Sequence, residues 1–483
     1  MSATIASEAT LSSVLHASLG GSPPRIVAAR GNYLRTEDGV DILDASGGAA
    51  VSCIGHGHPR VIQAIKDQLD AVEYCFSPWF TTAAYERLAK FLTDSTGGVM
   101  QKVFVCSSGA EAVEAALKMA RQYFMELAEP QPQRTRFIAR DRSYHGNTLG
   151  SLSVSGHKAR RTIYEPMLSQ NMTHVSPCFA YRGMKADETD EQYVARLAQE
   201  LEDEFQRVGS DTVCGFVAET VAGLTLGGVP PVPGYLKAMK AVCDKHGALF
   251  ILDEVFAGMG RTGTLHAWEQ EGVVPHLQTI AKGLGAGYQA VGALLVSKQV
   301  VDVLSKGTKA FVHFQTYHGH PLACAAAYEV QQVIKDEGLI ENCREMGAYL
   351  GELLKERLGS HKHVGDIRGR GLVWGVSIDH SSARYCRGAR ANECLQIEIV
   401  KDRQTKQPFP VTDKIAPTIH ATGLRKEFAI SLIPGGGVAD GTHGDLIVLA
   451  PAYNVTKMDV ELIVGRAAKA IEHVLGGQRD AKL

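Results

Sequence analysis

The sequence predicts an α/β fold, in which a large domain has a mainly parallel central sheet flanked by helices and a smaller domain is of the α+β class. Two observations support this prediction. Residues 213–218 and 248–252 are short apolar runs, which are typical of strands buried on both faces of a parallel sheet. A helical segment at 234–246 lies between them, and this succession of strand, helix and strand is the pattern of a βαβ unit.

The N-terminal region lies outside this alternating pattern. Residues 1–24 are expected to be loosely ordered, and residues 31–44 alternate like a hairpin. A helix is predicted at 61–72, where apolar residues recur three or four positions apart after His58-Pro59.

The strand predicted at 102–106 ends at a feature typical of anion sites. It runs into Ser107-Ser108-Gly109-Ala110-Glu111 and then into a long helix. Ser108 and Glu111 have the spacing of a capping box, which marks a helix N-terminus. Because free backbone N–H groups and the helix dipole favour an anion there, this turn predicts a phosphate site.

Two further strands lead into polar residues. The strand at 136–139 precedes Tyr144-His145-Gly146, and the strand at 213–218 precedes Glu219. The acidic helical stretch 185–207 is expected to be a surface insertion.

The pattern changes after a helix predicted at 321–334. From about residue 336 helices alternate with a few strands, such as 371–378 and 446–449, which indicates the second, smaller α+β domain. The polar, Arg-rich stretch 379–392 is expected to be a loop of that domain.

Two successive strands of the predicted sheet end at residues with complementary chemistry. Asp253 follows the apolar run 248–252, and Lys282 is the last residue of the short strand 279–282, before a glycine-rich turn. In open α/β sheets ligands bind beyond the carboxyl ends of the strands. A lysine that forms a Schiff base and a carboxylate that keeps a pyridine nitrogen protonated suit a pyridoxal phosphate site.

Composition and charge exclude several classes of partner. The formal net charge is −2, which provides no basic face for nucleic acid or for a membrane surface. No apolar run is long enough to span a bilayer. The 10 cysteines are scattered, which indicates a reducing compartment. We expect a cytoplasmic protein, with the peroxisome as the alternative because of the C-terminal Ala481-Lys482-Leu483.

Taken together, the motifs resemble those of the class-III (ω-type) aminotransferases, which are pyridoxal phosphate enzymes of fold type I. The resemblance runs from about residue 31 to the C-terminus. The motifs that carry it are, in order, Asp44, Gly55-His56-Gly57-His58-Pro59, Ser107-Ser108-Gly109-Ala110-Glu111-Ala112, Tyr144-His145-Gly146, Glu219, Leu252-Asp253-Glu254-Val255, Gly258-Met259-Gly260-Arg261-Thr262-Gly263, Lys282-Gly283, Thr316-Tyr317-His318-Gly319-His320-Pro321 and Arg368-Gly369-Arg370-Gly371-Leu372.

The resemblance implies an aminotransferase that moves an amino group from an amine or amino acid donor to an oxo acceptor. The mechanism would be ping-pong and would proceed through a Lys282 aldimine. Residues 1–75 would contribute to the small domain, 76–335 would form the large cofactor-binding domain, and 336–483 would complete the small domain. A homodimer is also implied, since the site of the family is built at the subunit interface.

The resemblance also implies roles for individual residues. Lys282 would act as general base and acid in the proton shift. Asp253 would pair with the pyridinium nitrogen, and Glu219 would lie near the ring hydroxyl and the substrate. The cofactor would further be bound by Ser108, Gly109, Ala110, Tyr144, His145 and Val255, and by Thr316, which would reach the cofactor phosphate of the partner subunit.

Two departures from the family pattern concern the substrate side. After Glu219 the usual Pro-Val-x-Gly is replaced by Thr220-Val221-Ala222-Gly223. His443 stands where many relatives carry an arginine that pairs with a substrate carboxylate, and a histidine is only partly charged near neutral pH. This predicts a substrate that is not a simple α-amino acid on that side, or a substitute such as Arg425. Trp79 is predicted to line the substrate pocket.

Other interpretations stay open at this point. The same lysine and aspartate would serve an aminomutase, a decarboxylase or a racemase of this fold. The pairs His56/His58, His318/His320 and His361/His363 would suit a metalloenzyme, but they lack the spacing of zinc motifs and we predict no metal site. Gly283-x-Gly285-x-Gly287 would suit a nucleotide-binding module, but it lacks the strand–turn–helix context. A non-catalytic relative is disfavoured because both the lysine and the aspartate are present.

Overall fold

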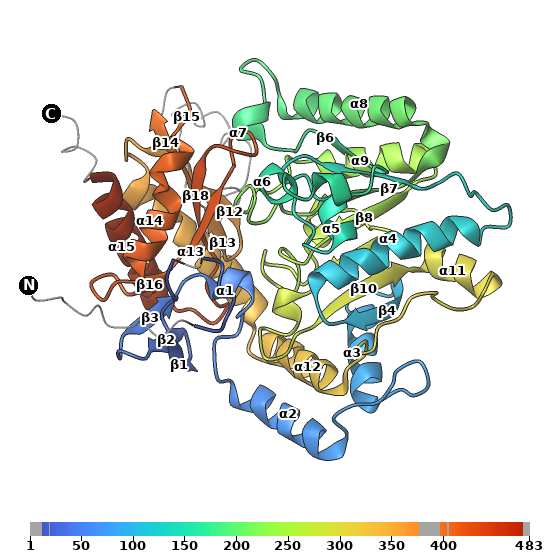
Figure 1. Ribbon diagram of the computed structural model, residues 1–483, viewed down its shortest axis with the longest axis horizontal. Helices are drawn as coiled ribbons and strands as arrows, with labels where there is room; N and C mark the ends of the chain where they lie inside the picture. Colours follow the sequence, from blue (N-terminus) through green and yellow to red (C-terminus); the bar gives the residue numbers. More distant parts are fainter. Residues whose placement is uncertain (1–11, 19, 376–396, 403–404, 477–483) are drawn as a thin grey trace, which may run out of the picture.

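The computed structural model describes residues 12–18, 20–375, 397–402 and 405–476, which form two lobes (Figure 1). The lobe on the right of Figure 1 is built from the middle of the chain around one large sheet. The lobe on the left combines the N-terminal strands with the C-terminal helices and strands. This architecture confirms the predicted α/β class.

The central sheet has seven strands. Across the sheet they are β4 (Met100–Cys106), β10 (Gly292–Ser297), β9 (Leu277–Ile280), β8 (Leu249–Asp253), β7 (Val213–Glu219), β5 (Arg136–Arg140) and β6 (Met172–Val175). From β9 to β6 every neighbouring pair is parallel, whereas β10 is antiparallel to both β4 and β9. The strands predicted for this sheet are confirmed, and the sheet also contains β6 and β10, which were not predicted.

Helices cover this sheet and build much of the other lobe. Those of the large lobe are α3 (Ala83–Asp94), α4 (Gly109–Met125), α5 (Leu149–Val154), α6 (Lys158–Arg161), α7 (Ala180–Gly183), α8 (Asp190–Val208), α9 (Tyr235–Lys245), α10 (Trp268–Glu271) and α11 (Lys298–Lys306). Below this lobe in Figure 1 lie α2 (Pro59–Ala71) and α12 (Pro321–Asp336), and the remaining helices are α1 (Gly47–Ala50), α13 (Leu339–Leu358), α14 (Ile415–Gly423) and α15 (Lys457–Gly476). The helices predicted at 61–72, 234–246 and 321–334 are confirmed. Within the described ranges, none of these helices combines the length and the apolar character that crossing a bilayer requires.

Successive residues of β7 and β8 point into different apolar cores. Phe216 and Phe250 belong to the core that contains residues of α8 and α9. Val217 and Ile251 belong to the core that contains residues of α4. Helices therefore cover both faces of the sheet, and this explains why the two strands are continuous apolar runs.

Helix α8 corrects one expectation, because it is a covering layer of the sheet and not a surface insertion. Its Tyr193, Leu197, Leu201 and Phe205 are buried in the core shared with β7 and β8. The acidic residues occupy the positions between them along an amphipathic helix.

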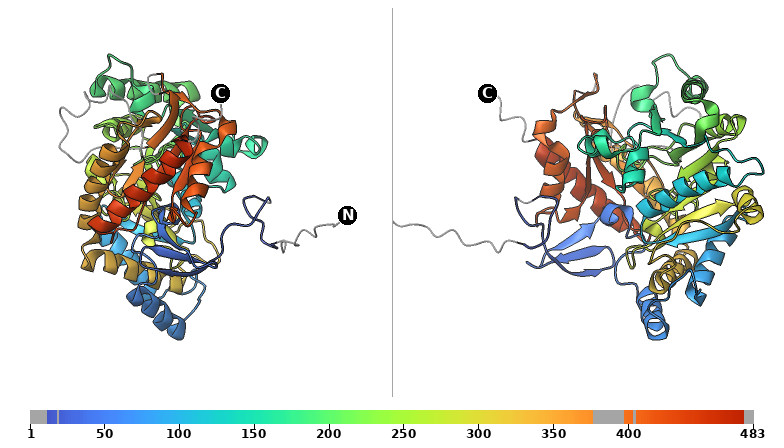
Figure 2. Two further views of the ribbon diagram at one scale, coloured as in Figure 1. Left: turned by 90° about the vertical axis from the view of Figure 1, so that its left-hand side faces the viewer. Right: turned by 45° about the vertical axis from the view of Figure 1, so that its right-hand side comes forward.

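Two smaller sheets lie in the other lobe (Figure 2), and the first of them joins strands from the two ends of the chain. The first contains β1 (Ile26–Arg30), β2 (Tyr33–Thr36), β3 (Asp41–Asp44) and β16 (Ile430–Ser431). The second contains β11 (Val364–Asp366), β14 (Ile397–Asp402), β18 (Asp445–Leu449), β13 (Val373–Gly375) and β12 (Arg368–Arg370), with β15 (Gln407–Pro408) on β14 and β17 (Ile433–Gly436) on β18. The antiparallel pair β2–β3 confirms the predicted hairpin, and β3 pairs in parallel with β16.

Some sequence predictions fall on parts of the chain that the structure does not describe. The loop predicted at 379–392 lies outside the described residues, as do residues 1–11 of the loosely ordered N-terminal stretch. The domain boundaries after residues 75 and 335 stay a prediction.

The buried side chain of Arg261 links the two lobes. It is 1% exposed, and its Nη1 donates to the carbonyls of Leu372 (3.1 Å) and Pro451 (2.5 Å). Its Nη2 reaches the carbonyl of Ala50 at 3.5 Å, and its guanidinium carbon lies 4.5 Å from the centroid of the Tyr453 ring. The three carbonyls belong to the N-terminal and C-terminal parts of the chain, so a single cation ties them to the large lobe.

Replacing Arg261 by Met is therefore expected to lower the free energy of unfolding by about 2–4 kcal/mol, because buried carbonyls lose their donors. Urea or thermal unfolding measures the effect. Arg60 is a matched control, since its guanidinium pairs with Glu329 and Asp336 at a much more exposed position. Arg60→Met should cost about 1 kcal/mol or less. Equal stability of the two variants would contradict the clamping role of Arg261.

Candidate active site

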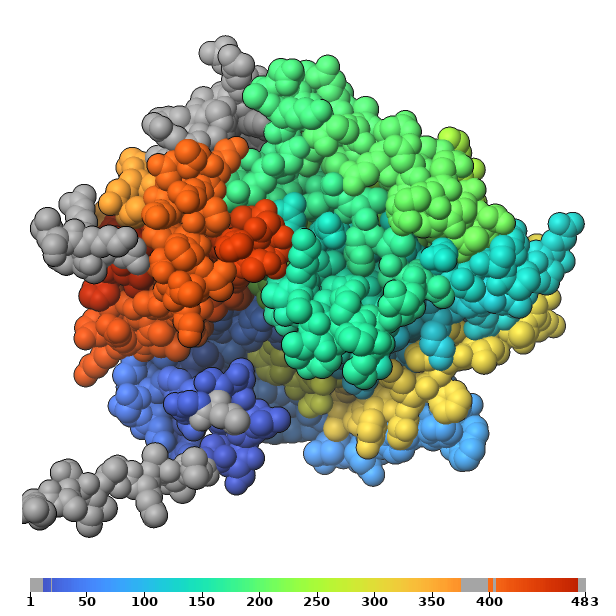
Figure 3. All heavy atoms as spheres, turned by 45° about the horizontal axis from the view of Figure 1, so that its top comes forward, coloured from blue at the N-terminus to red at the C-terminus, as the bar shows by residue number. Residues whose placement is uncertain are grey.

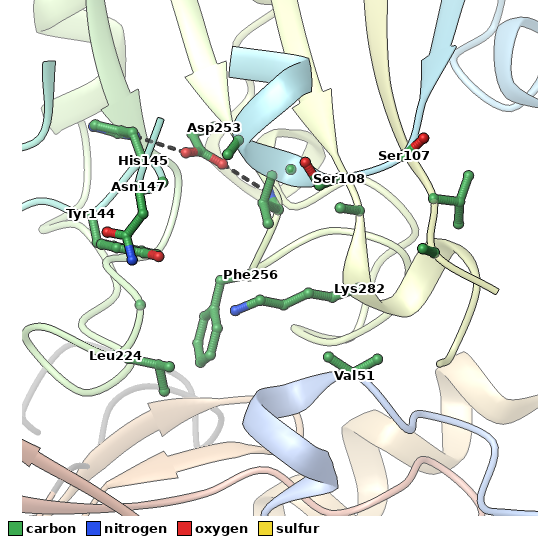
Figure 4. Close-up of a pocket in the computed structure, with 18 of the residues that line it drawn as sticks. Val51, Ser107, Ser108, Tyr144, His145, Asn147, Leu224, Asp253, Phe256 and Lys282 are labelled. Carbon is green, nitrogen blue, oxygen red and sulfur yellow. Dashed lines mark hydrogen bonds and ion pairs between the residues drawn. The ribbon is translucent and has the colours of Figure 1, made fainter. Parts of the chain in front are cut away.

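A cavity of about 550 Å³ lies at the carboxyl ends of β7, β8 and β9 (Figure 4). In an α/β sheet this is the edge where ligands bind. The cavity brings together residues that are far apart in the sequence. Its lining includes the predicted site residues Ser108, Gly109, Ala110, Tyr144, His145, Glu219, Asp253, Val255 and Lys282.

The carboxylate of Asp253 is held in one orientation at the end of β8. Its Oδ1 accepts a hydrogen bond from the backbone N–H of Val255 (2.9 Å), and its Oδ2 lies 2.7 Å from Nδ1 of His145. Both side chains are buried, and the backbone N–H of His145 donates to the hydroxyl of Ser155. Figure 4 shows the contact of Asp253 with His145. A carboxylate fixed in this way has a defined position for pairing with a ligand in the cavity.

Lys282 lies beyond the end of β9 and has an amine without a polar partner in the described part of the chain. Its backbone is left-handed (φ 42°), which is a strained conformation for a residue with a side chain. The Nζ atom lies 4.7 Å from the centroid of the Phe256 ring. Burial lowers the pKa of Lys282 to about 8, although the charges of Asp253 and Glu219 oppose the shift.

For the Schiff base that the sequence predicts at Lys282, this lowered pKa sets how the uptake of pyridoxal phosphate should depend on pH. Only the neutral amine is a nucleophile, and an amine becomes neutral above its pKa. The rate of uptake should therefore rise with pH to a midpoint near the lowered pKa of about 8 and then level off. Stopped-flow absorbance from pH 6 to 11 measures it. A rate that still rises at pH 10, as for an ordinary lysine with a pKa of 10.5, would contradict the prediction.

The turn between β4 and α4 has the features of an anion site. The Ser108 hydroxyl accepts a hydrogen bond from the N–H of Glu111 (3.2 Å), and the Glu111 carboxylate accepts one from the N–H of Ser107 (2.7 Å). The N–H groups of Gly109 and Ala110, in the first turn of α4, have no carbonyl partner within the helix and remain for a ligand. A Cβ atom on Gly109 would lie 2.7 Å from Cγ1 of Val255, so this backbone approaches the cavity wall closely.

Glu219 ends β7 with its side chain buried in the cavity wall. One carboxylate oxygen accepts a hydrogen bond from the N–H of Gly223 (2.9 Å), and the other lies 3.8 Å from a guanidinium nitrogen of Arg140. Burial raises the pKa of Glu219, and the nearby charges of His145 and Arg140 oppose that shift. The altered loop that ends at Gly223 therefore keeps the carboxylate at the site.

These features fit pyridoxal phosphate. The first turn of α4 suits the phosphate, the buried carboxylate of Asp253 suits a protonated ring nitrogen, and the amine of Lys282 suits the aldehyde. Two buried polar atoms of this wall, Nε2 of His145 and Oε2 of Glu219, have no hydrogen-bond partner among the described residues. Such orphan atoms indicate a place where a polar ligand completes the site.

Four residues predicted for the substrate or the cofactor do not line this cavity. Trp79 is 77% exposed, and Thr316 and Arg425 are exposed as well. His443 lines a separate depression, and its Nδ1 lies 2.8 Å from a carboxylate oxygen of Asp440. The prediction that Trp79 lines a pocket is thus not met within one chain, because its side chain faces outward.

Other residues that line the cavity were not predicted from the sequence. Phe256 faces the amine of Lys282, and Val51, Asn147, Leu224 and Gln289 also line the cavity. Phe256 follows Val255 directly and could have been found by extending that motif. Val51 directly follows α1, far from the other lining residues in the sequence. Its position at the edge of the central sheet is therefore apparent only from the fold.

Comparison with known proteins identifies similar chains. The family model described as aminotransferase class-III matches residues 21–471. An aminotransferase of Gibberella zeae is 47% identical over 96% of this chain and 86% of its own length. An uncharacterised aminotransferase of Schizosaccharomyces pombe is 46% identical over 93% of this chain and 92% of its own length.

Solved structures agree with these matches. A pyridoxal phosphate-bound amine transaminase from an uncultivated Pseudomonas species has a TM-score of 0.84 at 29% identity, and the match covers 95% of this chain and 97% of that one. An (S)-enantioselective ω-transaminase of Thermomicrobium roseum has a TM-score of 0.83 at 33% identity, and the match covers 94% and 93% of the two chains.

Proposed function

Because this chain belongs to the class-III aminotransferases, it is a pyridoxal phosphate-dependent aminotransferase, and we propose that Lys282 and Asp253 carry its chemistry. The observation that supports this proposal is the position of the two side chains in one cavity, at the carboxyl ends of the neighbouring strands β8 and β9. The lowered pKa of Lys282 and the fixed orientation of Asp253 suit the roles given below.

Bound pyridoxal phosphate supplies an aldehyde carbon that takes up an amino group and a pyridine ring that withdraws electrons. The residues of this chain position it and move protons. The N–H groups of Gly109 and Ala110, with the Ser108 hydroxyl, bind the phosphate. Asp253 holds a proton on the ring nitrogen, and His145 keeps that carboxylate in place. Lys282 Nζ takes the proton from the donor carbon and returns it on the other side of the transfer.

The remaining predicted residues shape the site. We assign Tyr144 and Val255 to the two faces of the cofactor ring, where they exclude water. Glu219 lies on the substrate side near the ring hydroxyl, and burial raises the pKa of its carboxyl group.

A ping-pong mechanism distinguishes this function from an aminomutase, a decarboxylase or a racemase. Loaded enzyme that is mixed with an amino donor alone should release about one equivalent of oxo product per site. After gel filtration, the enzyme should pass the stored amino group to an added oxo acceptor. A panel of amines and amino acids against pyruvate, 2-oxoglutarate and simple aldehydes also identifies the substrates. An amino group that never leaves its own molecule would indicate an aminomutase.

The proposed assembly is a homodimer, in which Thr316 reaches the cofactor phosphate of the partner. Large apolar side chains near Thr316 support it, because they are exposed in the single chain. Trp79, Phe314 and Tyr317 are each at least 60% exposed, and Phe76 contacts the rings of both Trp79 and Phe314. Exposed apolar clusters of this kind mark protein interfaces.

The double variant Trp79→Asp, Phe314→Asp is therefore expected to be monomeric and to bind pyridoxal phosphate more weakly. Light scattering after gel filtration and equilibrium dialysis measure the two effects. Met458→Asp is the matched control, since Met458 is a similarly exposed apolar residue on α15. A double variant that remains a dimer with unchanged cofactor affinity would contradict the proposed interface.

The location in the cell also stays a proposal, with the cytoplasm first and the peroxisome second. The Ala481-Lys482-Leu483 sequence on which the second depends lies outside the described residues. Microscopy of an N-terminal fluorescent fusion, with and without the change Leu483→Asp, distinguishes the two locations.

A further inference from the structure

Arg160 lies beside the cavity with its charge unpaired among the described residues. It belongs to the short helix α6, and its side chain is exposed. Its guanidinium carbon lies 4.8 Å from the centroid of the ring of Tyr144, which itself lines the cavity. A guanidinium stacked on an aromatic face keeps the N–H groups at its edge free for an anion.

The next residue, Arg161, already has partners within the protein. Arg161 donates to the carbonyls of Leu152, Ser153 and Ser155 and pairs with Glu165. These contacts hold α6 against the segment before it. Arg160, one residue away, makes none of them, so the fold does not explain an arginine at this position.

His443, which was predicted to lie on the substrate side, also has a partner within the protein. The ring of His443 is held by Asp440, and His443 lines a different depression. Its loop packs against α6, since a Cβ atom on Gly441 would lie 3.0 Å from Cδ of Lys158. Figure 3 shows the two segments meeting on the surface of the molecule. His443 therefore does not line the cavity, whereas Arg160 lies over the ring of Tyr144, which does.

We propose that Arg160 binds the carboxylate of the amino donor or of the oxo acceptor, and so selects carboxylate substrates over uncharged amines and aldehydes. The inference rests on the proposed function, because it assumes that the reacting carbon lies at Lys282. A substrate that extends from Lys282 past the edge of the Tyr144 ring would meet the guanidinium there. The planar fork of an arginine binds a carboxylate through two parallel hydrogen bonds, which makes the contact strong and directional.

The test compares Arg160→Met and Arg160→Lys with the native protein. Transfer is measured between carboxylate partners (4-aminobutanoate or L-alanine with 2-oxoglutarate or pyruvate) and between uncharged partners (1-phenylethylamine with propanal). Arg160→Met should raise KM for the carboxylate that it binds by about 10- to 100-fold. It should leave kcat and the kinetics of the uncharged pair within a factor of about three. Arg160→Lys should lie between the two, because it keeps the charge and loses the fork.

The control variant is Arg196→Met on α8. Arg196 also lies over a tyrosine ring, that of Tyr193 at 5.1 Å, but Tyr193, unlike Tyr144, is absent from the lining of the cavity. It should behave as native protein with both substrate classes. An equal loss with charged and uncharged substrates in Arg160→Met, or no change with either class, would overturn the proposal.

A binding measurement separates this inference from the proposed function. Glutarate carries carboxylates but no amino or oxo group, so its affinity by calorimetry does not depend on turnover. Native protein should bind glutarate about 10- to 100-fold more tightly than Arg160→Met. Equal affinities would refute the role of Arg160 even if amino transfer occurs. Unequal affinities without any amino transfer would refute the proposed function alone.

Discussion

Replacing Lys282 by Ala is expected to reduce kcat/KM for amino transfer by about 10³-fold or more, whatever the substrate pair. Lys282 is the lysine in the lining of the cavity, as far as the structure describes the chain. Its amine combines two requirements of the reaction, a lowered pKa and a position near both Asp253 and Glu219. No other lining residue supplies an amine, so neither the attachment of the cofactor nor the proton shift has a substitute.

This loss is distinguishable from unfolding. The variant should still bind pyridoxal phosphate, since the first turn of α4 and Asp253 are unchanged. Equilibrium dialysis and circular dichroism check that point. Lys298→Ala provides the control, because Lys298 is exposed at the start of α11 and pairs only with Asp302 within the described part of the chain. Turnover of Lys282→Ala at the native rate would contradict the proposed role.

The second largest effect is expected for Asp253→Asn, with kcat lower by about 10²- to 10³-fold. The substitution is nearly isosteric, so the fold and the cavity should persist. What is lost is the negative charge that we propose pairs with the ring nitrogen, and His145 loses its carboxylate partner at the same time. A ring nitrogen without a proton withdraws electrons poorly, so the carbon acid of the donor becomes harder to deprotonate.

The same variant has a readout that does not depend on turnover. The charge of Asp253 raises the pKa of Lys282 against the larger effect of burial. Removing the charge should therefore move the midpoint of cofactor uptake by the empty protein below the native value of about 8. A midpoint that stays in place, together with native kcat, would show that Asp253 only packs in the wall.

Several features were predictable because they are local in the sequence. The strand that ends at Asp253 is a continuous apolar run, and the structure buries every residue of β8. The capped turn at Ser108 is likewise encoded within a few residues, although Glu111 bonds the N–H of Ser107 and not that of Ser108. Such local patterns predict the structure correctly because the local conformational preference agrees with the tertiary fold.

The different surroundings of two adjacent acidic residues were not predictable from the local sequence. Asp253 and Glu254 follow the same strand, but only Asp253 lines the cavity. Glu254 is buried on the other side, where its carboxylate accepts bonds from the N–H groups of Ala267 and Trp268 and from Gln278. Burial raises the pKa of Glu254 to about 7. These partners come from later segments, so the sequence does not separate the two carboxylates by chemistry alone.

The other differences between the sequence predictions and the structure depend on contacts between segments that are far apart in the chain. Strand β10 is a short apolar run like its neighbours, yet it is antiparallel, and a run of apolar residues carries no direction. The acidic residues of α8 suggested a surface insertion, whereas its apolar stripe covers the sheet. Trp79 was predicted from its aromatic character, but its orientation depends on packing outside its own segment.

The central claim is that the cofactor is attached to this chain at Lys282. Reducing the loaded protein with borohydride and mapping its peptides by mass spectrometry tests the claim directly. We expect a pyridoxyl group on the peptide that contains Lys282 and on no other peptide, with loss of the visible absorbance band. A reduced group on a different lysine, or a loaded protein whose absorbance band resists borohydride, would contradict the account.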